Sequence, residues 1–520
     1  MPDDAPIPPR LAAPEAGTGT PPPLAGLGLI TVFALLSLAI HLVTLAITPY
    51  GIHRDELLYL AMGKHLQLWR MGFPPAIAVL TWAARGIFGD TLFAVRLFPA
   101  LAGALLTALT GLIARELGGG RAAQALAMLA VCLGPLFLHT AALCQPVVLD
   151  QLCWTLGFLA LIRLGQRRNG SGWWLLGLAG GLGLLTKFSI GFFAVGVGVA
   201  LVISPQRASL ASRWPWLALL TAAVIGSATL VGQFRLGFPV IRDMHDLQAQ
   251  QLYRVTVGGF LRGQVEMLGP AFLLAVLGLI GLLMGKSMRP YRTVGWTCLV
   301  TFLVLLGLHG KAYYIGPIYP MLLAAGTATT DSLAHNWRRA VRLSLTILIL
   351  SFDAVAMPFG LPILPPSQMA RFAGGSGLKD AVTSNRGVVL ALPQDYADML
   401  GWEDLTGAVA ETWRKLPLDQ QGQAVLLARN YGEAGALEFF GPRIGLVQPI
   451  VELDHSLLWP LPTGRLHGPV IAVGYSPEEL RSYFRVVELA RYFDHPWMVP
   501  EERNLPICVA KEPHPRSPGP

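Results

Sequence analysis

Four consecutive polar residues, His53, Arg54, Asp55 and Glu56, come directly after the first long apolar stretch of the chain. Tyr59 follows Asp55 by four residues. Residues four apart share one face of a helix, whereas neighbours point about 100° apart. Asp55 and Tyr59 can therefore act together, but only one of the two acids can readily aim at a reaction centre.

Further polar residues interrupt apolar segments later in the chain: Arg96, Asp150, Lys187 and Lys311, with Tyr313 and Tyr314 just after the last of them. A carboxylate can accept the proton of a hydroxyl group while that oxygen forms a new bond. Lys, Arg and Tyr side chains donate hydrogen bonds to phosphate oxygens. Acids, cations and tyrosines at one membrane face would therefore suit the transfer of a sugar from a phosphate-bearing lipid to a hydroxyl.

Each of these residues also has a purely structural explanation. Asp55 and Glu56 could cap a helix start, where the helix dipole favours negative charge, and Asp150 could do the same. Lys187 could be a lysine that reaches the membrane surface along its apolar stem. Lys311 and its tyrosines could belong to the aromatic belt at the interface. The catalytic hypothesis therefore depends on the combination, because no single residue establishes it.

The composition is that of a membrane protein with many spans. Of the 520 residues, 53% are hydrophobic and only 13% are charged, and the mean hydropathy is +0.52. These values exclude a disordered protein, a collagen and a disulfide scaffold, and they are unlike those of an ordinary cytosolic enzyme. The net charge of +8 comes mostly from basic residues between apolar stretches, so we expect no nucleic-acid partner. The five cysteines show no metal-ligand spacing.

Apolar and polar stretches divide the chain into three predicted parts. Residues 1–23 contain eight prolines and are expected to form a disordered cytoplasmic tail. Residues 24–357 are expected to form a transmembrane helix bundle of about eleven spans, with an interfacial loop at residues 49–90. In residues 358–520, short β-rich stretches alternate with helical ones, which predicts a soluble α/β domain. The predicted fold class is mainly α.

The basic residues of the short loops predict the orientation. If the N-terminal tail is cytoplasmic, most lysines and arginines of the short loops lie inside, as the positive-inside rule requires. An odd number of spans then places residues 358–520 outside, on the same side as loop 49–90. We therefore expect a multi-pass protein of the plasma (inner) membrane with an extracytoplasmic C-terminal domain.

Several short motifs stand in order along the chain: RDELLY at 54–59, FPP at 73–75, RLFPALAGA at 96–104, QPVVLD at 145–150, LLTK at 184–187 and KAYYIGPIYP at 311–320. In this order they resemble the bacterial integral-membrane glycosyltransferases of family 39, which are related to protein O-mannosyltransferases and to the lipid A aminoarabinose transferase. The resemblance covers approximately residues 24–330. NYGEAGALEFFGP, at residues 430–442, also resembles the extracytoplasmic part of many bacterial members.

This resemblance implies the C-type glycosyltransferase fold, a polyprenyl-phosphate sugar donor and transfer at the outer face of the membrane, usually with inversion. Carried over to this chain, Asp55 matches the expected general base, Glu56 could orient it, and Asp150 matches the second outer acid. The candidate substrate-binding residues are Arg54, Tyr59, Arg96, Lys187, Lys311, Tyr313 and Tyr314, of which the lysines and the last two tyrosines match positions near the donor phosphate. The chain departs from many relatives at Gly72-Phe73, where they carry a charged residue or histidine before the proline pair.

The predicted chemistry requires no cofactor. A polyprenyl monophosphate leaving group needs less charge neutralisation than a nucleotide diphosphate, so a few cations could stabilise it. A divalent metal could bind through Asp55 or Asp150, but no ligand cluster in the sequence compels one. The expected partners are the lipid-linked sugar donor, a glycolipid or protein acceptor, and membrane lipids.

Two other functions remain alternatives at this point. A secondary transporter would need ionisable residues or broken helices near the membrane midplane, in two related halves. A lipid-binding or assembly protein without catalytic activity would keep the bundle but would not need Asp55. The concentration of charged residues at one membrane face favours the enzyme over the transporter.

Overall fold

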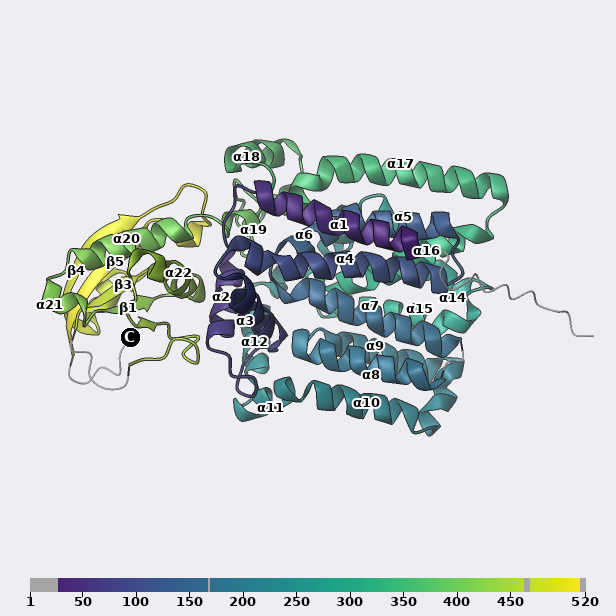
Figure 1. The fold of residues 1–520 in the computed structure, drawn as a ribbon, viewed down its shortest axis with the longest axis horizontal. Helices are drawn as coiled ribbons and strands as arrows, with labels where there is room; N and C mark the ends of the chain where they lie inside the picture. The colour runs from purple at the N-terminus through teal and green to yellow at the C-terminus, as the bar shows by residue number, and fades with distance from the viewer. Residues whose placement is uncertain (1–26, 167–168, 463–467, 515–520) are drawn as a thin grey trace, which may run out of the picture.

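The structure is elongated, with a bundle of long helices at one end and a small α/β domain at the other (Figure 1). It is a computed structural model that describes residues 27–166, 169–462 and 468–514. The tail predicted at residues 1–23 lies outside the described residues. The helical bundle and the C-terminal domain with its small sheet confirm the predicted fold class.

Within the described residues, five single helices are long and apolar enough to cross a membrane: α1 (Leu27–Ile47), α4 (Leu92–Glu116), α7 (Pro146–Gly165), α15 (Arg292–Gly307) with the turn η3 (Arg289–Tyr291) before it, and α17 (His335–Gly360). Four bent pairs would bring the number to nine: α5 (Arg121–Leu133) with α6 (Pro135–Ala142), α9 (Ile190–Ile203) with η1 (Pro205–Ala211), α10 (Trp214–Ile225) with α11 (Ser227–Arg235), and α13 (Val257–Leu268) with α14 (Ala271–Met284). The predicted count of about eleven also included two segments that are not among these nine. They are α8 (Asn169–Thr186) and the segment of η4 (Ala312–Ile318) and α16 (Tyr319–Thr329).

Two of the bends coincide with residues that interrupt a helix. Pro135 begins α6 and disfavours the helical conformation of Gly134, which is extended (φ −61°, ψ 130°). Gly269 ends α13 with φ 51°, in the left-handed region that glycine adopts most readily, and Pro270 follows it. The chain turns by 55° at the first break and by 110° at the second. As a result, α6 and α13 both contribute residues to the cavity described below.

Close helix contacts in the bundle depend on small residues. A Cβ atom on Gly278 of α14 would collide with the carbonyl oxygen of Leu322 in α16, and one on Gly326 of α16 would collide with that of Leu274 in α14. The two helices therefore touch backbone to backbone, as membrane helices commonly do at small residues.

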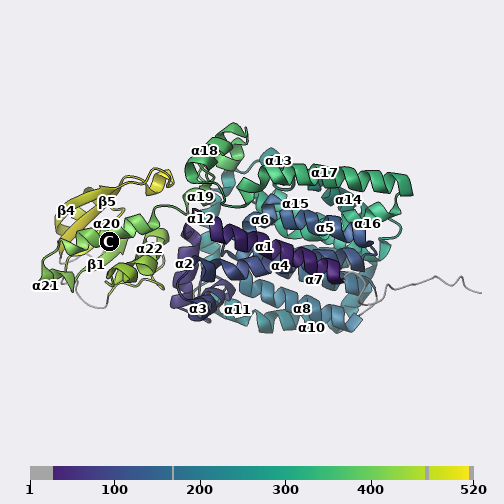
Figure 2. The same cartoon turned by 45° about the horizontal axis from the view of Figure 1, so that its top comes forward.

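Short helices cover the end of the bundle that faces the C-terminal domain, which we call the domain end. They are α2 (Arg54–Lys64), α3 (Ala76–Phe88), α12 (Pro239–Gln250), α18 (Pro366–Gly375) and α19 (Gln394–Ala397). In both views they lie between the long helices and the sheet (Figures 1 and 2). The loop predicted at residues 49–90 thus contains α2 and α3.

The C-terminal domain is built on a five-stranded sheet with the order β2-β1-β3-β5-β4. The strands are β1 (Val425–Ala428), β2 (Ile450–Val451), β3 (Val470–Val473), β4 (Phe484–Phe493) and β5 (Leu505–Pro513). β1 runs parallel to β2 and β3, whereas β5 is antiparallel to β3 and β4. The helices of this domain are α20 (Trp402–Arg414), α21 (Leu418–Gln421), α22 (Tyr431–Phe440) and α23 (Pro477–Arg481).

One hydrophobic core joins this domain to α2. Leu57 and Leu60 of α2 belong to the same buried cluster as Leu437 of α22 and Ile471 of β3. Successive residues of a strand face opposite sides of a sheet, so the neighbouring Val470 packs in a separate core on the other face. The helix that carries Asp55 is therefore anchored to the sheet domain through shared apolar packing.

We expect Gly326→Val to destabilise the bundle, because the added methyl groups would collide with the backbone of α14 at Leu274. Overpacking typically costs about 1–3 kcal/mol, so the midpoint of thermal unfolding in detergent should fall. Gly198→Ala on α9 is the control, since nothing lies within 4 Å of a Cβ there. An unchanged midpoint for Gly326→Val would contradict the backbone contact between α14 and α16.

Candidate active site

A cavity of about 1540 Å³ opens at the domain end of the bundle. Residues of α2, α6, α12, α13, η4 and α17 line it, together with α18, α19 and the chain between them. Five of the predicted site residues are part of the lining: Arg54, Asp55, Lys311, Tyr313 and Tyr314. The other five lie behind it: Glu56, Tyr59, Arg96, Asp150 and Lys187.

Asp55 lies in the first turn of α2 and faces this cavity. Its Oδ1 accepts a hydrogen bond of 2.9 Å from the hydroxyl of Tyr431, and its Oδ2 accepts one of 3.2 Å from the side-chain amide of Gln145. The Asp55 backbone N–H donates to Nδ1 of His53 at 3.0 Å, which caps the helix. A carboxylate oxygen has more than one lone pair, so this group can still accept a proton from a bound hydroxyl.

Glu56 does not line the cavity and forms a buried ion pair with Arg96 of α4. Arg96 Nε and Nη2 each lie 2.9 Å from one of its carboxylate oxygens. The backbone N–H groups of His53 and Cys144 donate to the same carboxylate at 2.8 Å. Burial acts to raise the pKa of Glu56, but the charge and hydrogen bonds of Arg96 outweigh it and lower that pKa. The capping explanation holds for Glu56, which attaches the start of α2 to the bundle.

Lys187 lies behind a pair of tyrosines that line the cavity. Its Nζ is 5.5 Å from the ring centroid of Tyr313 and 5.3 Å from that of Tyr314. These distances are those of cation–π contacts. The two rings meet edge to face, with centroids 4.8 Å apart. The positive charge of Lys187 therefore acts on the cavity across the tyrosine rings.

Asp150, in the first turns of α7, is fully enclosed beside Lys187. Its Oδ1 accepts a hydrogen bond of 2.9 Å from the indole N–H of Trp154, and its Oδ2 accepts one of 2.6 Å from the hydroxyl of Ser189. Lys187 is close enough for its charge to influence that of Asp150. This arrangement makes Asp150 a partner of Lys187 and keeps it away from the cavity wall.

Lys311 precedes η4, lines the cavity and donates a hydrogen bond of 2.9 Å to Oδ1 of Asn385. Burial lowers the pKa of Lys311 to about 8, against the opposing effect of the Asp395 and Asp55 charges. Lys187 adds a further lowering. The charged groups predicted from distant turns of the chain are therefore close enough to influence one another's ionisation.

Arg54 and Tyr59 flank Asp55 on α2. The guanidinium carbon of Arg54 lies 4.8 Å from the ring centroid of Tyr431, and Arg54 Nη2 lies 3.5 Å from Oε1 of Glu502. Burial, followed by the charge of Asp55, raises the pKa of Tyr59 well above its usual value. Tyr59 is therefore a neutral neighbour of Asp55, on the face of the helix that the four-residue spacing predicts.

The motifs did not indicate that His139, Asp395 and Asp398 also line this cavity. Asp395 Oδ2 lies 2.8 Å from Nε2 of His139, and its Oδ1 lies 3.5 Å from Nε2 of His53. Burial acts to raise the pKa of Asp395, but the hydrogen bonds to these histidines outweigh it and lower that pKa. Burial raises the pKa of Asp398 to about 6. The segment QDYAD carries no recognisable signal, because α19 reaches the cavity only through tertiary packing.

One group among the described residues has the ligand types and closeness that a metal ion needs: His53, Asp395 and Asp398, with candidate atoms within 4.8 Å of one another. However, Nδ1 of His53 accepts the backbone N–H of Asp55, so a neutral His53 carries its proton on Nε2. A metal-bound imidazole has the opposite arrangement, since it coordinates through a lone pair and donates from its other nitrogen. In this arrangement Nε2 of His53 has no free lone pair for a metal ion. Asp55 and Asp150, the acids through which a metal could bind, each accept hydrogen bonds on both oxygens.

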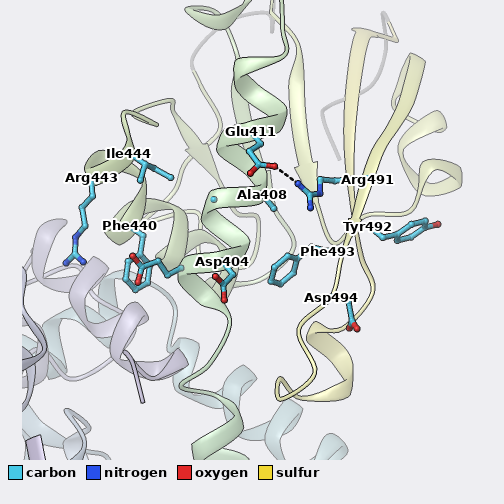
Figure 3. Close-up of a pocket in the computed structure, with 12 residues that line it drawn as sticks. Asp404, Ala408, Glu411, Phe440, Arg443, Ile444, Arg491, Tyr492, Phe493 and Asp494 are labelled. Carbon is cyan, nitrogen blue, oxygen red and sulfur yellow. Dashed lines mark hydrogen bonds and ion pairs between the residues drawn. The ribbon is translucent and has the colours of Figure 1, made fainter. Parts of the chain in front are cut away.

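A second pocket, of about 530 Å³, lies within the C-terminal domain between α20, η7 (Gly441–Ile444) and β4 (Figure 3). Figure 3 shows an ion pair between Glu411 and Arg491 at its wall, and both side chains are exposed. Exposed ion pairs contribute little to binding or stability. Its described lining contains none of the predicted site residues, so the large cavity is the candidate active site.

Comparisons with known proteins agree with this architecture. Residues 73–231 match the family described as dolichyl-phosphate-mannose-protein mannosyltransferase. The chain is 26% identical over 306 residues to the lipid A galacturonosyltransferase RgtD from Rhizobium johnstonii, in a match that covers 56% of this chain. The match spans 63% of that relative, which is less than two thirds of its length.

The fold is shared with solved membrane enzymes. A crystal structure of ArnT from Cupriavidus metallidurans bound to undecaprenyl phosphate has a TM-score of 0.60 and 17% identity, over 94% of this chain and 98% of that one. The oligosaccharyltransferase of Archaeoglobus fulgidus has a TM-score of 0.50 and 11% identity, over 80% of this chain and 64% of that one. The chain has the C-type glycosyltransferase fold. The predicted resemblance to integral-membrane glycosyltransferases is thereby confirmed.

In this C-type fold the bundle makes the chain a multi-pass membrane protein, and the cavity lies at the end of the bundle that carries the sheet domain. Asp55 enters the cavity from the first turn of α2, while Lys311, Tyr313 and Tyr314 enter it from the segment before α16. The acid and Lys311 thus come from segments far apart in the sequence.

We expect Arg96→Met to destabilise the protein, because it leaves the Glu56 carboxylate buried without its cation. Removing one partner of a buried ion pair typically costs about 3–5 kcal/mol. Arg96→Met combined with Glu56→Gln should recover part of that loss. The midpoint of thermal unfolding in detergent measures the stability of the single and the double variant.

Arg491→Met is the matched control, because its pair with Glu411 is exposed and such pairs contribute about 0–1 kcal/mol. Equal stability of Arg96→Met and Arg491→Met would contradict the structural role of the Glu56–Arg96 pair.

Proposed function

We propose that the chain is a membrane glycosyltransferase that moves a sugar from a polyprenyl-phosphate donor to an acceptor hydroxyl. The observation that carries this proposal is one cavity whose lining contains Asp55 together with Lys311, Tyr313 and Tyr314. Two relatives support it by their names: RgtD is a lipid A galacturonosyltransferase, and ArnT was crystallised with undecaprenyl phosphate.

Asp55 is the general base in this proposal. As the acceptor oxygen forms its bond to the anomeric carbon of the sugar, Asp55 takes the hydroxyl proton. The bond between that carbon and the phosphate oxygen breaks at the same time, and polyprenyl phosphate leaves with the electron pair. A single displacement of this kind inverts the anomeric configuration.

The leaving phosphate gains negative charge as the sugar departs, and Lys311 is placed to stabilise it. The hydroxyls of Tyr313 and Tyr314 can donate hydrogen bonds to the same oxygens. Lys187 adds positive charge from behind the two rings, and the nearby charge of Asp150 favours its charged form. Preorganised cations and donors of this kind stabilise a developing anion without a metal ion.

The remaining substrate surfaces follow from the cavity wall. Apolar side chains of α17 such as Phe352 and Val355, together with Phe260 of α13, line its membrane side and suit an isoprenoid chain. The acceptor, a glycolipid or a protein, enters beside Asp55, where the C-terminal domain covers the cavity. The reaction as proposed requires no cofactor, and we expect no nucleic-acid partner.

The orientation is part of the same proposal. Arg121 at the start of α5, Arg163 in the last turn of α7 and Arg338 at the start of α17 lie at the end of the bundle remote from the domain. Clusters of basic residues in short loops face the cytoplasm. The cavity and the C-terminal domain therefore face outwards from the plasma (inner) membrane.

We expect Asp55→Asn to reduce sugar transfer by roughly 10²–10⁴-fold, the usual contribution of a general base. The substitution is isosteric, and Asn can still accept a hydrogen bond from Tyr431. The measurement compares the mass of envelope glycolipids and glycoproteins from cells that carry each form, with one missing sugar as the readout.

Asp404→Asn is the matched control, because this exposed acid of α20 lies outside the large cavity. It should keep full activity. Full activity of Asp55→Asn, in protein that is present in the membrane at the normal level, would remove Asp55 as the base and with it this proposal.

The role of Lys311 predicts a pH dependence. Because the pKa of Lys311 is lowered to about 8, the lysine is charged below that pH and neutral above it. The kcat/KM for the donor, which reports the ionisation of the free enzyme, should therefore fall as the pH rises through about 8. Lys311→Arg should remove this decline, because arginine stays charged up to a pH of about 12.

Lys64→Arg is the control for the same substitution at a lysine of α2 that pairs with Glu438 outside the cavity. It should leave the profile unchanged. A Lys311→Arg enzyme with the same alkaline decline as the parent would exclude Lys311 as the group that titrates.

A further inference from the structure

We propose that Tyr431 of the C-terminal domain is a positioning residue for Asp55, so that the NYGEAGALEFFGP segment completes the active site. This inference rests on the proposed role of Asp55 as general base. The Tyr431 hydroxyl donates a hydrogen bond of 2.9 Å to Oδ1 of Asp55, across 376 residues of sequence. Tyr431 also lines the large cavity, so the contact is made at the reaction centre and not at a remote interface.

The start of α22 holds Tyr431 in a defined place. Asn430 caps this helix: its Oδ1 accepts the backbone N–H groups of Gly432 at 2.9 Å and Glu433 at 3.2 Å. Its Nδ2 donates to Oε1 of Glu502 at 3.0 Å. Because one amide side chain satisfies the helix terminus and a buried carboxylate together, the first turn of α22 has little freedom to move.

Two glycines allow α22 to approach α2. A Cβ atom on Gly432 would lie 2.9 Å from Cγ of Arg54, and one on Gly435 would lie 2.8 Å from Cβ of Leu57. Larger residues at either position would push the helices apart. The glycines therefore bring Tyr431 within hydrogen-bonding distance of Asp55.

Arg54 holds the tyrosine ring from the other side. Its guanidinium carbon lies 4.8 Å from the centroid of the Tyr431 ring, and its Nη2 lies 3.5 Å from Oε1 of Glu502. Burial and the charge of Asp55 raise the pKa of Tyr431 well above its usual value, although Arg54 opposes this shift. The phenol therefore keeps its proton and acts as a donor to the carboxylate.

The hydrogen bond has a geometric consequence for a base. Together with the amide of Gln145 on Oδ2, it fixes the plane of the Asp55 carboxylate relative to the cavity. Loss of the phenol hydroxyl would therefore leave the donor lipid bound but the base less well oriented.

Tyr431→Phe tests this role, because it removes one oxygen and keeps the ring under Arg54. We expect kcat to fall roughly 10- to 100-fold, as for the loss of a hydrogen bond to a charged group. The KM for a polyprenyl-phosphate sugar should change by less than about twofold, since Tyr431 acts only through Asp55.

The split between kcat and KM separates positioning from a merely structural role. A cavity that is distorted by the substitution would also bind the donor less well and raise KM, whereas a misoriented Asp55 lowers kcat alone.

Tyr492→Phe is the matched control, since this tyrosine of β4 belongs to the same domain but is 58% exposed and lies outside the large cavity. It should leave both kcat and KM unchanged. A Tyr431→Phe enzyme with unaltered kcat, or with a KM raised as much as kcat is lowered, would overturn the inference. If Asp55→Asn is inactive in the same assay, only the positioning role fails; if Asp55→Asn is active, the base assignment fails as well.

Discussion

The buried ion pair between Glu56 and Arg96 is the interaction on which the candidate active site depends. An unpaired charge in this environment would be strongly destabilising, so the carboxylate is held by Arg96 and by two backbone N–H groups together. These contacts allow one orientation for the first turn of α2. Because adjacent helical residues point about 100° apart, that orientation directs Asp55 towards the cavity.

The helix that carries Asp55 is attached on two sides. Arg96 connects its start to the bundle, while Leu57 and Leu60 share a core with the sheet of the C-terminal domain. A domain linked only by a flexible segment could shift without effect on the reaction centre. Here a movement of the domain would displace α2, so the two parts of the chain form one structural unit.

The charges around the cavity form two groups, one in its wall and one behind the wall. Asp55 and Lys311 line the wall, whereas Lys187 lies behind the rings of Tyr313 and Tyr314 and is balanced by Asp150. The charges behind the wall act at short range through apolar material, where electrostatic effects are stronger than in water.

The fold is shared with ArnT at 17% identity, because apolar periodicity and small contact residues specify helix packing in many sequences. That packing does not by itself specify the polar side chains at the domain end.

Local patterns in the sequence were sufficient to predict the membrane bundle and the sheet domain. They also predicted that the side chains of Asp55 and Glu56 point in different directions. Hydropathy and helical rotation are properties of neighbouring residues, and they do not require knowledge of the rest of the chain. The sequence motifs also indicated Lys311, Tyr313 and Tyr314, which the structure places in the wall of one cavity with Asp55.

Only the tertiary structure decided which polar residues meet. It paired Glu56 with Arg96, placed Lys187 behind the tyrosines and brought Asp395 and Tyr431 to Asp55's cavity. The contact between Tyr431 and Asp55 joins residues 376 positions apart. Such contacts follow from how helices and sheet pack against one another, and the periodicity of each segment contains no information about the neighbours it will have.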